Sequence, residues 1–118
     1  MTIAPVSPLA PIWDSPAFEH LAALVSRGWL FSPSFDDEGC LDRVLGAYTW
    51  IAEGAVDAIR IKGPDDSGAL RCDHANGLLW EREGSLTYVL EELLVLPCPS
   101  DPLAPRLVLA AAPRLWTP

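Results

Sequence analysis

Three cysteines and two histidines are the side chains of this 118-residue sequence best suited to metal binding or nucleophilic catalysis. Cys72 and His74 lie close together, whereas Cys40 and Cys98 are distant in sequence and no second Cys/His pair follows. Zinc sites usually combine two such pairs, so a site built from all four residues is the less favoured alternative. Buried cysteine commonly acts as a small apolar residue. We therefore expect no metal and no cofactor, with Cys72 structural and His74 at the surface.

A nucleophilic active site also lacks its usual sequence signals. Catalysis by serine or cysteine requires a neighbouring base, and no G-x-S-x-G turn is present. Cys98 stands between two prolines without a basic neighbour, and His20 falls on the flank of a predicted helix. The segment GPDDSG places two carboxylates where a phosphate loop would bind its anion. The sequence favours a non-enzymatic protein, and a small carboxylate- or Cys/His-based enzyme is the alternative.

Acidic residues outnumber basic ones by 16 to 8, which gives a net charge of −8. This balance disfavours direct binding to nucleic acid or to an anionic membrane, because both recruit Lys and Arg. Several short acidic runs would together form a negative face suited to a basic groove on another protein. The alternative is a solvated surface that keeps an apolar-rich domain in solution. The acidic interface candidates are Asp36, Asp37, Glu38, Asp65 and Asp66, with Asp42, Glu81 and Glu83 as further members of the face.

Tryptophan provides the second signal for an interface. Three of the five tryptophans fall in or next to predicted helices and strands and are expected in the core. Trp13 and Trp116 instead lie in two proline-containing arms, residues 1–13 and 112–118. Tryptophan is favoured at interface hot spots, so we predict that Trp13 and Trp116 contact another protein or a second copy in a homodimer. The alternative is that both arms fold back over the core of their own domain.

Two amphipathic segments predict helices over residues 16–27 and 86–96, because their apolar side chains recur at helical spacing. Asp14 or Ser15 is expected to cap the first helix and Ser85 the second. Segment 64–74 is interpreted as a short helix, with a strand from Ala69 to Asp73 as the alternative.

Runs of β-branched and aromatic residues predict the strands. Trp29 to Phe31 either start a strand or pack under the core, and the following SPSFDDEG stretch is interpreted as a surface loop. Residues 75–77 are expected to form a turn, since Asn76 tolerates a positive φ. Three strands are predicted, over residues 43–52, 55–62 and 78–83. An additional edge strand over residues 106–111 is optional.

The chain length fits one domain over residues 1–118. We expect an α+β fold in which a three- to four-stranded antiparallel sheet carries both main helices on one face. The first residues lack the basic start and unbroken apolar stretch of a signal peptide, and three scattered cysteines are no disulfide framework. These features predict a reduced, cytoplasmic protein, and a single lysine among many Ala, Pro and Gly suggests a GC-rich bacterial genome. We expect an accessory, regulatory or inhibitor protein that binds protein through an apolar and acidic surface.

Overall fold

The computed structural model describes residues 16–112. The helices and strands follow one another in a simple order along this part of the chain. They are α1 (Pro16–Ser26), β1 (Leu30–Phe35), β2 (Leu41–Trp50), β3 (Ala55–Gly63), β4 (Asp66–Asp73), β5 (Gly77–Gly84), α2 (Leu86–Val95) and β6 (Ala110–Ala111).

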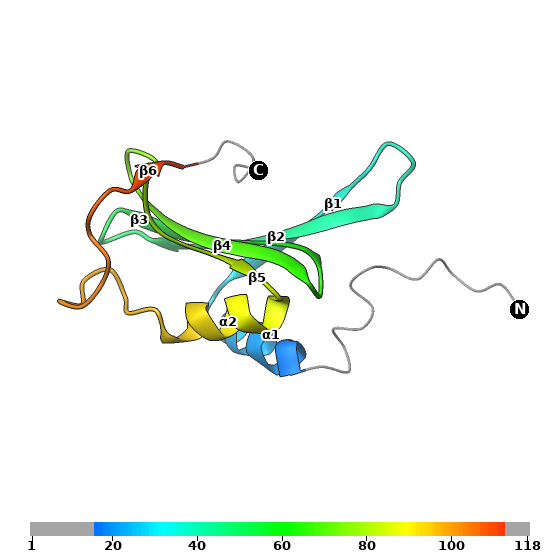
Figure 1. The fold of residues 1–118 in the computed structure, drawn as a ribbon, viewed down its shortest axis with the longest axis horizontal. Coiled ribbons are helices and arrows are strands. Elements are labelled where there is room, and N and C mark those ends of the chain that lie inside the picture. The colour runs from blue at the N-terminus through cyan, green and yellow to red at the C-terminus, as the bar shows by residue number, and fades with distance from the viewer. Residues whose placement is uncertain (1–15, 113–118) are drawn as a thin grey trace, which may run out of the picture.

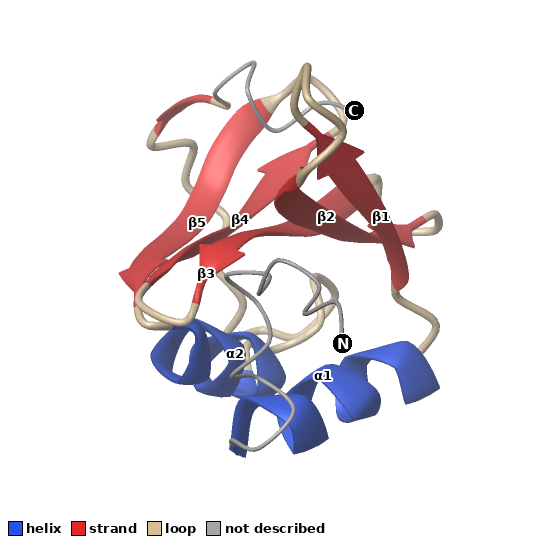
Figure 2. Cartoon of the chain, turned by 90° about the vertical axis from the view of Figure 1, so that its right-hand side faces the viewer, coloured by secondary structure: helices blue, strands red, loops and turns tan. Residues whose placement is uncertain are grey.

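The strands form one antiparallel sheet in the order β1-β2-β3-β4-β5-β6, so each strand pairs with its neighbour in sequence. Short turns connect β1 through β5, whereas α2 and a longer loop lie between β5 and β6. Gly54, at φ 67°, turns the chain between β2 and β3. Asn76, at φ 60°, does so between β4 and β5, as predicted. Both helices lie side by side against one face of the sheet (Figures 1 and 2), which leaves the opposite face without a helix.

The predicted strand number was wrong: the sheet has six strands rather than three or four. Ser32 to Phe35, interpreted as loop, complete β1, and Pro33 is tolerated because β1 is an edge strand. Residues 66–73, interpreted as a short helix, form β4, so the strand alternative was correct. Pairing with β3 and β5 on both sides outweighs the local helical preference of this segment.

The two predicted helices are confirmed within one residue at each end. The Ser85 hydroxyl accepts a hydrogen bond from the Tyr88 amide at 3.2 Å, which caps α2 as expected. Asp14 and Ser15, the expected caps of α1, lie outside the described residues. The edge strand expected over 106–111 contains only Ala110 and Ala111.

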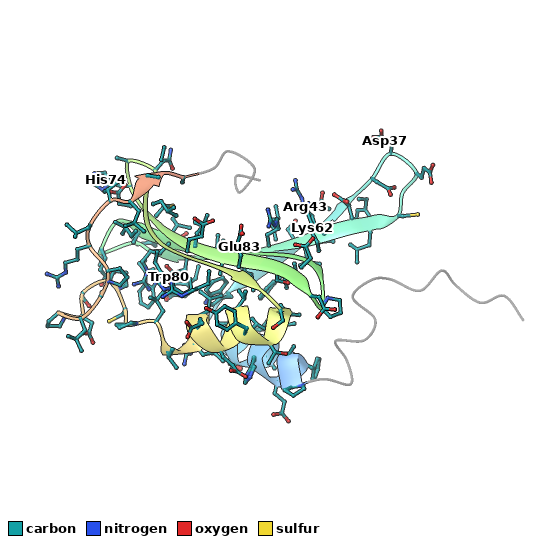
Figure 3. The ribbon with its side chains drawn as sticks, viewed as in Figure 1. Asp37, Arg43, Lys62, His74, Trp80 and Glu83 are labelled. Atoms are coloured by element: carbon teal, nitrogen blue, oxygen red, sulfur yellow. The ribbon has the colours of Figure 1, made fainter. Side chains whose placement is uncertain are left out.

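The main core fills the space between the helices and the sheet. Trp80 is buried there, as predicted, and points from the sheet toward the helix side (Figure 3). Trp29, expected to cap the core, is also buried, whereas Trp50, predicted in the core, is only half-buried. Gly46 lets the Phe31 ring lie close to β2, since a Cβ at residue 46 would lie 2.5 Å from that ring. The helices contribute a continuous apolar layer to this core: Ala17, Leu24, Leu86, Val89, Leu90 and Leu93.

Candidate functional site

Side chains of each strand alternate between the two faces of the sheet. On β3, Ile59 belongs to the core under the helices, whereas its neighbour Ala58 belongs to a separate apolar cluster on the other side. We call that other side the helix-free face. The register aligns four of its side chains in one row across the sheet, in the order Leu30, Ala47, Ala58 and Leu70.

This row produces a groove, because two alanine methyls lie between two larger leucines. The cavity has a volume of about 360 Å³. Ser32 and Asn76 are the polar residues that line it, apart from the Cys72 thiol. Leu70 is only 2% exposed and Ala58 only 8%, although neither helix covers their face. The groove is also lined by Gly46 and by a set of apolar residues. They are Leu30, Phe31, Leu45, Ala47, Val56, Ala58, Ile59, Leu70 and Ala112.

Charged side chains lie beside the groove on the same face. Arg43 and Lys62 rise from β2 and β3, and Glu83 rises from β5, all on the side away from the helices (Figure 3). The strand register places two more charged residues on this face, Arg60 beside Leu45 and Glu81 beside Leu70. The helix-free face is therefore basic toward β2 and β3 and acidic along β5.

Cys72 is the one thiol in the groove wall. Burial raises the pKa of this thiol, and the carboxylates of Asp73 and Asp57 raise it further. A raised pKa keeps the thiol neutral at physiological pH, and the neutral thiol is a poor nucleophile. Among the described residues that line the groove, none is a histidine or a carboxylate. The described lining is apolar apart from Ser32, Asn76 and the Cys72 thiol.

A second cavity, of about 470 Å³, lies on the helix side of the sheet. Of the described residues that line it, Asp57 is the only carboxylate. Arg71 donates to both oxygens of Asp57, with Nη2 2.8 Å from Oδ2, and the Trp50 indole donates to the same carboxylate at 2.9 Å. Arg71 also donates to the Pro97 carbonyl at 2.6 Å. Together these hydrogen bonds connect β2, β3, β4 and the segment after α2. The Asp57 carboxylate therefore has a structural role and is not a free acid or base.

The acidic interface candidates lie at two turns at the same end of the sheet. Asp36, Asp37 and Glu38 occupy the turn between β1 and β2, where Asp36 accepts hydrogen bonds from the amides of Glu38 and Cys40. Asp65 and Asp66 lie at the turn between β3 and β4. The cationic Arg43 and Lys62 lie on the strands between the Asp37 turn and Glu83 (Figure 3), so the acidic runs do not form one unbroken negative face.

The cysteines and histidines are not brought together. Cys40 follows the β1–β2 turn, whereas Cys98 follows α2 at the opposite end of the molecule. His20 lies on α1, with Nε2 3.7 Å from the Glu91 carboxylate on α2. Within residues 16–112, no three metal-binding side chains gather at one point.

Trp13 and Trp116, the apolar interface candidates, lie outside the described residues. The groove itself was missed by sequence reasoning. One signal for it was present, because β3 carries apolar residues on both faces. Val56 and Ala58 lie on one face, and Ala55, Ile59 and Ile61 lie on the other. A strand that is apolar on both faces is typical of a sheet covered on both sides.

Comparison with known proteins adds no relative: no family model, no curated protein and no solved structure matches the chain. Across residues 16–112, neither helix has the length and apolar character needed to cross a membrane.

Proposed function

We propose that this protein is a non-enzymatic accessory or regulatory protein that binds an apolar segment of a partner protein in the groove of its helix-free face. The groove is the observation that carries the proposal, since it is a concave apolar site of a size suited to large side chains. Leu30 and Leu45 would contact the partner's side chains, and the alanine row would leave room for them.

The basic residues beside the groove indicate that the partner segment carries an acidic residue. Arg43, Arg60 and Lys62 are on the β2–β3 side of the helix-free face of an otherwise acidic protein. A segment with an acidic residue beside its apolar anchor would match this side, and electrostatic complementarity would fix its direction across the strands. We therefore propose an apolar and acidic polypeptide as the partner rather than a nucleic acid or a membrane.

We also propose a cytoplasmic location for this binding. Cys40, Cys72 and Cys98 are free thiols, which supports a reducing compartment.

The test is fluorescence anisotropy with two labelled eight-residue peptides that carry Leu-Trp, flanked in one by Asp and in the other by Arg. We expect the Asp-flanked peptide to bind about tenfold more tightly, because it alone complements Arg43 and Lys62. Arg43→Ala should reduce this preference. Ala58→Phe should abolish binding of both peptides, because the new ring fills the groove.

Ala22→Phe is the matched control, since Ala22 is exposed on α1, away from the helix-free face. It should bind both peptides as the unaltered protein does. The proposal is wrong if neither peptide binds, or if Ala58→Phe and Ala22→Phe behave alike.

A further inference from the structure

Two positively charged side chains lie side by side on the helix-free face. Val44 of β2 pairs with Ile61 of β3, and Arg43 and Lys62 are the next residues on the two strands. Both side chains rise away from the helices (Figure 3). Neither side chain makes a hydrogen bond or an ion pair with a described residue.

The carboxylates of the described residues do not neutralise this pair. Asp42 precedes Arg43 in sequence and Glu83 rises from β5 on the same face, but neither forms an ion pair with Arg43 or Lys62. Like charges on neighbouring strands repel each other. The pair therefore leaves uncompensated positive charge at one place on a protein whose net charge is −8.

Two β-bulges lie at this pair. The pairing of β3 with β4 shifts between Ile61 and Gly63, which leaves Lys62 as an extra residue without a partner on β4. The pairing of β1 with β2 also shifts, and there Asp42 is the extra residue, directly before Arg43. Bulges are frequent next to functional sites, where they change the direction of a side chain. The local backbone thus departs from regular pairing where the two cations meet.

The donors around the pair suit a phosphate group. Ser34 of β1 is the direct partner of Arg43, so its side chain lies on the same face beside the guanidinium. The Nε atom of Arg43 is buried and has no hydrogen-bond partner among the described residues. A guanidinium can bind two oxygens of one phosphate, and an ammonium adds a point charge. Two cations and a hydroxyl complement a dianion better than they complement a single carboxylate.

We propose that Ser34, Arg43 and Lys62 bind a phosphate monoester carried by the partner segment. We call these three residues the phosphate row. The inference rests on the proposed function, because it identifies the acidic group beside the apolar anchor as a phosphorylated serine or threonine. Anchor and phosphate then bind as two linked groups, so a segment that carries both binds more tightly than one that carries either alone.

The distance between the groove and the phosphate row sets the spacing within the partner segment. Ala47 lines the groove, and Arg43 lies four residues away along β2. Four residues of a strand span about 13 Å. An extended segment needs four residues to cover this distance, so the phosphorylated residue should be four positions from the side chain that fills the groove. A phosphate on the adjacent residue would be too far from the phosphate row.

The test is fluorescence anisotropy with labelled eight-residue peptides that contain Leu-Trp and differ only four positions from the tryptophan. That position carries phosphoserine, aspartate or serine. We expect the phosphoserine peptide to bind about tenfold more tightly than the aspartate peptide. Moving the phosphoserine next to the tryptophan should remove this advantage, although the charge of the peptide is unchanged. Equal affinity of the phosphoserine and aspartate peptides would overturn the inference.

Charge-removing variants test the residues themselves. Arg43→Gln and Lys62→Gln should each reduce the advantage of the phosphoserine peptide at least about threefold, because each removes one of two cations. Arg27→Gln is the matched control, since Arg27 is exposed after α1 on the helix side and the substitution removes the same charge. It should leave the advantage unchanged. An equal reduction in Arg27→Gln would assign the preference to net charge and contradict the phosphate row.

Inorganic phosphate distinguishes the two sources of the same chemistry. It should displace the phosphoserine peptide only at a concentration at least about a hundredfold higher than the unlabelled peptide needs, because it lacks the anchor. Displacement at equal concentrations would mean that the site takes free phosphate, and would overturn the phosphorylated partner.

Ala58→Phe separates the two proposals, because it fills the groove without changing the phosphate row. If the phosphoserine and aspartate peptides bind equally and Ala58→Phe abolishes both, the proposed function stands and the phosphate row is wrong. If the phosphoserine peptide binds Ala58→Phe as it binds the unaltered protein, but loses affinity in Arg43→Gln, the phosphate row is supported and the groove-based function is wrong.

Discussion

The two faces of the sheet are built from the same strands but are closed in different ways. Under the helices, Ile59, Ile61 and Trp80 meet a continuous apolar layer from α1 and α2. On the helix-free face, the corresponding central positions carry Ala47 and Ala58, and a groove remains. Small side chains in a row thus leave a hollow on the face that the helices do not cover.

The polar groups of the two faces differ as well. The helix side holds a buried Asp57–Arg71 pair whose bonds are directed to other parts of the fold. The helix-free face carries its charges at the margins of the groove, where Lys62 and Glu83 remain accessible. The first arrangement suits structural stability and the second suits recognition.

The largest expected effect comes from Asp57→Asn on the helix side. The substitution keeps the volume of the side chain but leaves the Arg71 guanidinium, which is 0% exposed, without a counter-charge. Removing one partner of a buried pair costs about 3–5 kcal/mol of unfolding free energy. Denaturant titration would measure this loss. Glu81→Gln on the helix-free face should change stability by less than about 0.5 kcal/mol, and a similar loss in both variants would erase the distinction.

An intermediate effect should separate two alanines on neighbouring strands. Ala69 is packed under the helices, so Ala69→Val should lower the unfolding free energy by about 1–3 kcal/mol through overpacking. Ala58 borders the groove, so Ala58→Val should cost less than about 0.5 kcal/mol. Thermal or denaturant unfolding of the two variants tests this difference directly. Equal losses would show that the groove is as tightly packed as the core.

The smallest effect is a pH dependence due to Cys72. Burial raises the pKa of this thiol in the folded state, so folding favours the protonated form. The resulting stabilisation is complete below the ordinary thiol pKa and is lost as the pH rises through the folded-state value. The unfolding free energy of the unaltered protein should therefore fall between pH 8 and 10 relative to that of Cys72→Ala. A constant difference over this range would mean that the thiol is hydrated and the groove floor wet.

Local patterns in the sequence determined most of the regular elements. Helical spacing of apolar residues located α1 and α2, and Ser85 was recognisable as a cap because capping depends on neighbours within one turn. Strands β2, β3 and β5 were recognisable from their β-branched and aromatic residues. These features depend on interactions between residues close together in the chain.

Only the tertiary structure decided the strand number, the identity of β4 and the groove. Segment 66–73 carries a weak local signal and becomes a strand because β3 and β5 satisfy its hydrogen bonds from both sides. The groove requires Leu30, Ala47, Ala58 and Leu70 to align across four strands, which is a consequence of register. Register depends on pairing between distant residues, so no local pattern in the sequence specifies which side chains share that row.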